Sequence, residues 1–352
     1  MDYYIDIDRK KRNTAGAKAP ADISAICKKM GMKRFAMPMF PQERNKIYQK
    51  AWLLLTGGFY WMKLLHTVQK GDRVIYQHPM YGNRMALKMI PKIRQKKSCK
   101  FVVLIHDLES LRKGIEGVVE SNEKTNLIAD NQLLNQFDYL ICHNEHMKQY
   151  LISQGFEPSK LICLGIFDYL SETKRKQGKK SKKPSLAIAG NLAKGKSGYI
   201  YELMQKDTGV QIHLYGINFD ETKSNSDTIY HGSFKPEELP DHLEGDFGLV
   251  WDGPSAESCV GNTGEYLKYN NPHKTSLYLS SNMPVIIWKE AAMADFVLEN
   301  KVGIAVDNLY EVKNAIANIS ETEYQNLCEN VRKISDNLKN GYYFREALEN
   351  CH

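Results

Sequence analysis

The chain of 352 residues lacks several features that would fix its class at once. Its seven cysteines are scattered and include no Cys-x-x-Cys pair, which is typical of reduced thiols rather than of a disulfide framework. No apolar run approaches the roughly 20 residues that span a bilayer. The first residues also lack a basic segment followed by an apolar one, so we expect no signal peptide. We therefore expect a cytoplasmic protein, with peripheral contact at the inner face of the membrane as an open alternative.

Common cofactor signatures are also missing. The sequence has neither a G-x-G-x-x-G loop nor a Walker loop, which argues against dinucleotide oxidoreductases and P-loop NTPases. No group of histidines, cysteines and carboxylates has the spacing of a metal site, and Asp6-Ile7-Asp8 belongs to the end of a strand pattern. Although the net charge is +7, no basic motif is interleaved with aromatic residues. We expect no metal or other cofactor and no nucleic-acid partner.

Short apolar runs alternate along the whole chain with longer helical patterns, as in parallel sheets with crossover helices. The expected strands are Tyr3 to Ile7, Arg34 to Met37, Arg73 to Tyr76, Phe101 to Ile105, Tyr139 to Cys142, Leu161 to Leu164, Leu186 to Ala189, Gln211 to Tyr215, Thr228 to His231, Gly248 to Trp251, Val285 to Trp288 and Gly303 to Val306. The expected helices of the first half are Pro20 to Met30, Lys46 to Gln69, Arg84 to Gln95, Glu123 to Asn135 and Glu145 to Gln154. We predict an α/β protein with two doubly wound, Rossmann-like domains that face each other across a cleft.

The segment from Ser171 to Pro184 separates the two halves. It contains no hydrophobic residue and is rich in lysine, which predicts a mobile connector. The expected units are therefore residues 1–170, a basic linker at 171–184, residues 185–339 and a C-terminal segment at 340–352.

Turns after the strands of the second half are the first candidates for a ligand site, because doubly wound sheets bind ligands beyond the carboxyl ends of their strands. The small-residue turn that starts at Gly190 carries two lysines and can approach a diphosphate closely, although a plain strand-to-helix turn is an alternative. Two later strands also end in glycine, either for a ligand or for turn geometry. The candidates in these turns are Gly190, Asn191, Lys194, Lys196, Tyr215, Gly216 and Gly232.

A strand that ends in Trp251-Asp252-Gly253 and a helix that opens with Asn271-Pro272-His273-Lys274 predict an anion pocket. Asn271 suits a helix cap and Pro272 a first helical position, so His273 and Lys274 would lie where free amides favour phosphate. Trp251 offers a ring for stacking and Asp252 a carboxylate for hydroxyl groups, although the tryptophan could simply pack. Alone, a His-Lys pair is usually solvated surface.

The first half supplies a complementary set of candidates. A glycine-containing loop from Thr14 to Lys18 follows the first strand and would admit substrate through Gly16 and Lys18, or would be an ordinary turn. One strand delivers His106-Asp107 and another delivers His143, where an imidazole beside a carboxylate could act as a general base.

Longer motifs carry a family resemblance over essentially the whole chain, strongest after Gly248. These motifs are Ile105-His106-Asp107-Leu108-Glu109-Ser110-Leu111-Arg112, Gly165-Ile166-Phe167-Asp168-Tyr169-Leu170, Ala189-Gly190-Asn191-Leu192, Leu249-Val250-Trp251-Asp252-Gly253, Tyr269-Asn270-Asn271-Pro272-His273-Lys274-Thr275-Ser276-Leu277-Tyr278-Leu279, Pro284-Val285-Ile286-Ile287-Trp288 and Ala291-Ala292-Met293-Ala294-Asp295-Phe296. Together they resemble the bacterial β-1,6-galactofuranosyltransferases of O-antigen assembly, which in turn resemble glucosyltransferases that extend sugars on adhesins. The lysine-rich linker is longer and more basic than the family pattern.

The resemblance implies a GT-B glycosyltransferase that uses UDP-galactofuranose, with inversion and without a metal. It implies that the second half binds the donor, including through Tyr266, that the first half binds a saccharide or lipid-linked acceptor, and that the C-terminal segment packs back on the first half. In this interpretation Lys194, Lys196, the Gly190 turn, His273 and Lys274 meet the diphosphate. Asp107 is the first candidate base, with His106 as its partner or replacement.

Other functions are compatible with the same residues. The donor could be UDP-glucose or UDP-GlcNAc, with protein-linked glycans as acceptors. A non-catalytic UDP-sugar-binding subunit and a UDP-sugar epimerase are alternatives from other classes, and a homo-oligomer is compatible with each of them.

Overall fold

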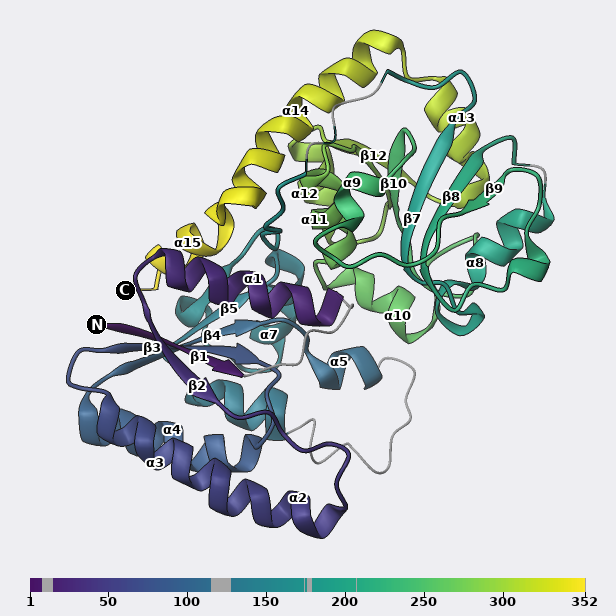
Figure 1. Cartoon of the computed structure of the whole chain (residues 1–352). Coiled ribbons are helices and arrows are strands. Elements are labelled where there is room, and N and C mark those ends of the chain that lie inside the picture. The colour runs from purple at the N-terminus through teal and green to yellow at the C-terminus, as the bar shows by residue number, and fades with distance from the viewer. Residues whose placement is uncertain (8–14, 115–127, 174, 176–178, 207, 352) are drawn as a thin grey trace.

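A computed structural model describes residues 1–7, 15–114, 128–173, 175, 179–206 and 208–351. These residues form two lobes, each built on a parallel six-stranded sheet (Figure 1). The expected strands are confirmed, with shifts of a few residues at their ends. Within the described residues, every helix is too short or too polar to cross a membrane.

The first sheet has the strand order β2-β1-β3-β4-β5-β6. Its strands are β1 (Asp2–Ile7), β2 (Lys33–Met37), β3 (Arg73–His78), β4 (Lys100–Ile105), β5 (Tyr139–Cys142) and β6 (Leu161–Cys163). The central strands are buried on both faces, which explains their continuous apolar runs. Because the order reverses between β1 and β3, the carboxyl ends of these strands and of neighbouring β4 form the binding edge of this sheet.

The first-lobe helices are α1 (Ala15–Lys29), α2 (Lys46–Trp52), α3 (Gly58–Thr67), α4 (Asn83–Lys97), α5 (Glu109–Gly114) and α7 (Glu145–Ser153), with short turns η1 (Leu53–Gly57), η2 (Ile128–Leu133), η3 (Leu134–Gln136) and η4 (Pro158–Lys160). The single helix expected from Lys46 to Gln69 is interrupted by the wider π-helical turn η1, which ends at the Gly57-Gly58 pair. Of the helix expected from Glu123 to Asn135, residues 123–127 lie outside the described residues, and the rest forms η2 and η3.

The second sheet has the order β12-β11-β10-β7-β8-β9. Its strands are β7 (Ser185–Asn191), β8 (Gln211–Ile217), β9 (Thr228–Tyr230), β10 (Phe247–Val250), β11 (Val285–Trp288) and β12 (Gly303–Val306). Counted from β7, this order is that of a dinucleotide-binding fold, and the direction reverses between β7 and β10. The crevice beyond these two strands is therefore where this sheet can bind a ligand.

Helices cover both faces of the second sheet and continue into the first lobe. They are α8 (Lys194–Gln205), α9 (Leu239–His242), α10 (Gly261–Glu265), α11 (His273–Ser280), α12 (Met293–Glu299), α13 (Val312–Ala317), α14 (Glu321–Asn340) and α15 (Tyr342–Glu349), with turns η5 (Glu221–Lys223), η6 (Tyr266–Lys268) and η7 (Leu309–Glu311). The long helix α14 runs from the second lobe toward the first, and α15 lies beside α1 near both chain ends (Figure 1).

Helix α15 is anchored to the first lobe by apolar and polar contacts. Phe344 and Leu348 are buried in one cluster with Ile23 and Ile26 of α1. The carboxylate of Asp168 accepts hydrogen bonds from the first-turn amides of Tyr343 and Phe344, at 3.2 and 2.8 Å. These amides have no partner inside the helix, so the carboxylate caps α15.

Within the predicted linker, the side chain of Arg175 is bound to the second lobe. The guanidinium donates hydrogen bonds to the carbonyls of Leu243, Gly245, Ser281 and Asn282. Two of these carbonyls follow α11, where the helix leaves its last acceptors without internal partners. Arginine can satisfy several such acceptors at once, a signal that composition alone does not carry. Linker residues 174 and 176–178 lie outside the described residues.

Candidate active site

The reversal point of the second sheet brings together two loops that the sequence predicted separately. Helix α8 begins directly after β7, and Lys194 and Lys196 are exposed in its first turn. The loop after β10 approaches this turn, because the amide of Gly253 donates to the carbonyl of Lys196 at 3.0 Å. Gly253 has φ +112°, and a Cβ there would lie 2.4 Å from the carbonyl oxygen of Val260. Gly198 of α8 lets the loop fold against the helix, because a Cβ there would lie 2.7 Å from the carbonyl oxygen of Pro254. The turn before it, which ends at a kink at Ser197, presents Lys194 and Lys196 to an anion.

The other strand-end glycines serve the backbone more than a ligand. A Cβ on Gly216 would lie 1.7 Å from the carbonyl oxygen of Gly190 on the paired strand, so β7 and β8 require glycine at this point. The amide of Gly216 also donates to the carbonyl of Gly232 at 2.8 Å. Asn191 is exposed, and its side-chain oxygen accepts from the amide of Ala193 at 3.1 Å, which shapes the turn into α8.

Two aromatic residues predicted to line the nucleotide site are core residues. Trp251 is fully buried, donates from its indole to the carbonyl of Ser255 and packs edge-on against Trp288. Tyr215 is also buried, and its hydroxyl accepts a hydrogen bond from the amide of Glu244 at 2.8 Å. Their rings are therefore not available for stacking on a base. Of the two interpretations of Trp251, the structure supports packing.

Lys274 and Asp252 are each other's partners. The Nζ atom of Lys274 lies 2.9 Å from Oδ1 of Asp252 and 2.9 Å from the carbonyl oxygen of Trp251. The expected division, with the lysine on phosphate and the carboxylate on hydroxyl groups, does not fit this geometry. The pair instead fixes the loop after β10 to α11, and the same loop contacts the backbone of exposed Lys196 on α8.

Asn271 joins the two halves instead of capping a helix. Helix α11 begins at His273 with Pro272 at the N-cap position, which corrects the predicted cap. The amide side chain of Asn271 accepts from Asn144 Nδ2 at 2.7 Å and donates to the carbonyl of His143 at 2.7 Å. Asn271 also donates to the carbonyl of Gly165 at 3.0 Å. The side chain is satisfied entirely by groups of the first half.

His143 is the buried counterpart of this junction. Its Nδ1 accepts from the amide of Asn271 at 2.9 Å, and its Nε2 donates to the carbonyl of Ile105 at 3.0 Å. Burial lowers the pKa of His143 to about 4, so the imidazole is neutral at pH 7. With both nitrogens engaged, His143 is a structural residue at the junction and not the acceptor-side group that the sequence suggested.

His273 and Lys18 lie close together at the same junction. The His273 ring lies 5.1 Å from that of Tyr169, and burial, followed by the charge of Lys18, lowers the pKa of His273 to about 3. The Nε2 atom of His273 is enclosed and makes no hydrogen bond within the described part of the chain. Lys18 is bound by Asp22 and by the carbonyl of Leu170. His273 is therefore a neutral imidazole and cannot supply positive charge to a phosphate.

Gly16 falls within α1, which begins at Ala15 and is therefore longer than predicted. The start of the predicted substrate-admitting loop, Thr14, lies outside the described residues, as does Asp8 of the Asp-x-Asp pattern. Lys18 lies in this helix too and is only 5% exposed, so its ammonium faces the protein interior.

Asp107 is the carboxylate at the binding edge of the first sheet. It lies two residues after the end of β4 and is partly buried, and burial raises its pKa above the ordinary value. The opposing influences are the positive charges of Arg112 and Lys196 and a hydrogen bond from Tyr266. Lys196 and Tyr266 belong to the second half, so Asp107 faces the loops of the second half directly. A carboxyl group with a raised pKa, placed between two lobes, suits proton transfer.

His106 and Tyr266 position the strand end that carries Asp107. The Nε2 atom of His106 lies 2.8 Å from Gln77 Oε1, and the ring stacks on Phe167 with centroids 5.5 Å apart. The hydroxyl of Tyr266, which is buried, accepts from the amide of Leu108 at 3.0 Å. The sequence placed Tyr266 at the nucleotide, but its polar atom reaches the candidate base.

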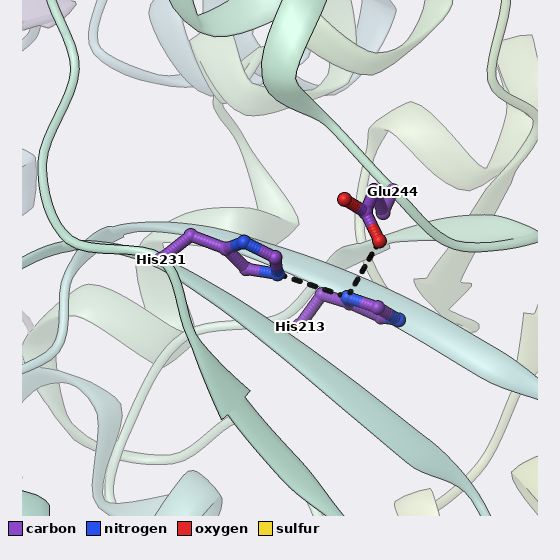
Figure 2. Close-up of side chains that lie close together, drawn as sticks. All are labelled: His213, His231 and Glu244. Carbon is purple, nitrogen blue, oxygen red and sulfur yellow. Dashed lines mark hydrogen bonds and ion pairs between the residues drawn. The ribbon is translucent and has the colours of Figure 1, made fainter.

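His213, His231 and Glu244 form a group that was not among the residues predicted from the sequence, with ligand atoms within 4.8 Å of one another. Figure 2 shows Nδ1 of His213 facing Nε2 of His231 at 3.0 Å, with a Glu244 oxygen 3.7 Å from the same Nδ1. The ring centroids are 5.3 Å apart and the planes differ by 17°, so the rings lie end to end. At this separation one of the two nitrogens carries a hydrogen and donates it to the lone pair of the other. A metal would need both nitrogens deprotonated and directed at one point. The arrangement is a hydrogen-bonded pair, and its spacing in sequence gives no motif.

Comparison with known proteins places both halves of the chain in one family. The family model named 'Glucosyltransferase 3-like, N-terminal domain' matches residues 2–166. The family model of the corresponding C-terminal domain matches residues 186–351.

Individual relatives agree with these matches. Beta-1,6-galactofuranosyltransferase WbbI of Escherichia coli (strain K12) is 38% identical over 255 residues, 71% of this chain and 70% of the relative. Glucosyltransferase 3 of Streptococcus gordonii is 28% identical over 291 residues, 81% of this chain and 80% of the relative. Among solved structures, the apo form of the lipopolysaccharide outer core galactosyltransferase WaaB superposes with a TM-score of 0.61 at 10% identity, over 100% of this chain and 99% of that one. This last likeness concerns the fold alone.

Proposed function

The chain belongs to the glucosyltransferase 3-like family and is a glycosyltransferase of the GT-B fold, and from this premise we propose that it transfers galactofuranose from UDP-galactofuranose to a saccharide acceptor. The acceptor is a growing cell-surface polysaccharide of the O-antigen or capsule type. In this proposal residues 185–339 bind the donor and residues 1–170 bind the acceptor. The proposed donor is supported by the 38% identity to WbbI, whose name states that sugar.

The observation that carries the proposed mechanism is the position of Asp107 opposite Lys196. In the proposed reaction the carboxylate of Asp107 accepts the proton of the acceptor hydroxyl while that oxygen attacks the anomeric carbon. The bond from this carbon to the UDP oxygen breaks, and the configuration inverts because attack and departure occur on opposite faces. Burial raises the pKa of Asp107 toward the working pH, which favours a general base.

Charge on the departing UDP grows during this step and needs a stabilising group. Lys194 and Lys196 are exposed in the first turn of α8, before the kink at Ser197, and their ammonium groups can stabilise this charge. These groups support a transfer that requires no metal, as we propose. In this scheme Lys274 acts only by holding the loop at Asp252. His273 is neutral and supplies no charge to the departing UDP.

UDP-glucose is the second donor to test, because Glucosyltransferase 3 of Streptococcus gordonii is 28% identical over 81% of the chain. A transferase for UDP-glucose or UDP-GlcNAc that extends protein-linked glycans is therefore the alternative. Purified protein should be offered UDP-galactofuranose, UDP-glucose, UDP-galactopyranose and UDP-GlcNAc in turn, with lipid-linked, soluble and peptide-linked saccharides. Products are identified by mass spectrometry, and the anomeric configuration by NMR.

We expect product from UDP-galactofuranose alone, with inverted configuration and an unchanged rate in EDTA. Product only from UDP-glucose would replace the donor and keep the reaction class. Binding of UDP without turnover of any donor would identify a non-catalytic subunit. Loss of activity in EDTA, restored by a divalent ion, would contradict the metal-independent step.

A further inference from the structure

Helices α2 and α3 lie on the side of the first lobe that points away from the second lobe (Figure 1). These helices and η1 between them expose a set of large apolar side chains. Leu54, Leu55 and Phe59 are 67%, 75% and 63% exposed, and Ile47 is 82% exposed. Tyr48 and Met62 extend the same face. Single exposed apolar residues are normal, but a contiguous apolar surface marks an interaction site.

The apolar side chains follow a helical repeat. Ile47 and Leu54 are seven residues apart, as are Tyr48 and Leu55, while Phe59 follows Leu55 by four. The wider turn η1 shifts the helical phase between α2 and α3, so Phe59 and Met62 continue the exposed side. Trp61, seven residues after Leu54, turns to the core instead. On the opposite side of α3, Trp61, Leu64 and Leu65 are buried in the first-lobe core. The core contacts of α3 are thus complete, and the outer face is a second, separate apolar surface.

Positive charge borders this face. Arg84, Lys88, Lys92 and Lys96 are all exposed and recur every four residues along α4, which packs beside η1 and α3. Lys46, Lys50 and Lys63 are exposed on α2 and α3 themselves. Neither α2, η1, α3 nor α4 contains an aspartate or a glutamate. The face is apolar in the middle and cationic at the border.

We propose that this face, which consists of residues 46–67 and the exposed cations Arg84, Lys88, Lys92 and Lys96 of α4, binds the surface of an anionic lipid bilayer. Apolar side chains of an amphipathic helix enter the boundary between head groups and acyl chains, while lysines and arginines pair with lipid phosphates. A second copy of the chain is a poorer occupant. In a two-fold contact each face meets itself, so the cations of both copies would be brought together.

The position of this face suits an acceptor held in a membrane. Helix α4 starts just after β3, at the edge where β3 and β4 end and where Asp107 lies. The face thus belongs to the lobe to which we assign the acceptor, and the start of α4 connects it to the edge that carries Asp107. The lipid contact itself does not depend on the identity of the donor.

The test is flotation of the full-length protein with vesicles of phosphatidylcholine alone or mixed with phosphatidylglycerol. We expect the protein to float with the mixed vesicles and to be released by salt, because the cationic border is screened. Leu55→Ser with Phe59→Ser should weaken binding about 10-fold or more, since the apolar contact is lost. Arg84→Gln, Lys88→Gln and Lys92→Gln together should abolish the preference for phosphatidylglycerol.

Matched controls lie elsewhere on the surface. Leu298→Ser removes an apolar side chain that is 50% exposed on α12, and Lys333→Gln removes an exposed cation on α14. Both should bind vesicles like the wild type. All variants should keep the wild-type melting temperature and turnover with a soluble acceptor, so that loss of flotation is separated from unfolding and from failure of the proposed reaction.

Three results would overturn the proposal. The first is wild-type protein that stays unbound in the presence of the mixed vesicles. The second is flotation that the variants of the face leave unchanged. The third is a dimer in sedimentation velocity that the Leu55 and Phe59 changes convert to monomer, which would identify a second copy as the occupant.

Discussion

The hydroxyl of Tyr266, in the second half of the chain, accepts a hydrogen bond at 3.0 Å from the amide of Leu108 in the first half. Leu108 follows Asp107 directly, and the same hydroxyl lowers the pKa that burial raises at Asp107. A residue of the second half therefore contributes to both the position and the proton affinity of the candidate base. This contact makes the proposed mechanism testable from either lobe.

Replacing Asp107 with asparagine should remove the base and leave the shape of the site intact. We expect kcat to fall by about 10²- to 10⁴-fold, the usual contribution of general base catalysis. The dissociation constant for UDP, measured by titration calorimetry, should change by less than about twofold. An equal loss of UDP binding would contradict the role assigned to this carboxylate.

Tyr266→Phe should move the acid limb of the pH profile of kcat. The hydroxyl favours the ionised form of Asp107, so its removal raises the pKa of the base, and activity is lost at a higher pH as the solution is acidified. The unpaired amide of Leu108 should also lower the free energy of unfolding by about 1 to 3 kcal/mol. A lower kcat with an unmoved acid limb would indicate a structural role alone.

Lys196→Ala and Lys274→Ala should fail in different ways. Lys196 is exposed at the start of α8, so its loss should weaken UDP binding about 10-fold with little change in melting temperature. Lys274 is paired with Asp252, so its loss should lower the free energy of unfolding by about 2 kcal/mol, because a partly buried carboxylate loses its partner. Calorimetry and urea unfolding of both variants separate the two effects.

Gly216→Ala should destabilise the second lobe strongly, by about 3 kcal/mol or more. The new Cβ would lie 1.7 Å from the carbonyl oxygen of Gly190, and the backbone at Gly216 has φ +145°. Gly195→Ala is the matched control, since a Cβ there meets no atom within 4 Å. Urea unfolding should show little change for Gly195→Ala, and a similar loss in both variants would argue against the close strand contact.

The pH dependence of stability should report the neutral imidazole of His143. Burial lowers the pKa of His143 to about 4, so below about pH 6.5 the unfolded chain binds a proton that the folded chain does not. Stability from this group is therefore lost as the pH falls, by about 1.4 kcal/mol per unit down to the folded pKa.

The comparison with His143→Gln isolates this term from other groups. Burial raises the pKa of Asp22 to about 6 and of Asp168 to about 7, and these carboxyls act in the opposite direction. Both effects are shared by wild type and variant, so the difference in their free energies of unfolding should shrink between pH 6.5 and pH 4. A constant difference would mean that His143 is not buried in its neutral form.

The sequence by itself determined the strands, their grouping into two α/β lobes and the family. Parallel strands buried on both faces leave continuous apolar runs, and the helices between them leave a different period, so both are readable locally. The motifs around Asp107 and after Gly248 were equally local. The turns that meet at the reversal of the second sheet were predicted because strand ends converge there in any fold of this kind.

Only the tertiary structure decided which polar groups remain available to a ligand. Lys274 meets Asp252 from another element, and His143 meets Asn271 from the other lobe, 128 positions along the chain. Trp251 and Tyr215 face the core, while Arg175 of an apparently featureless linker is fixed by four carbonyls. The physical reason is that a residue's type states what it can bind, whereas its burial and its partners, which come from distant segments, decide what it has already bound.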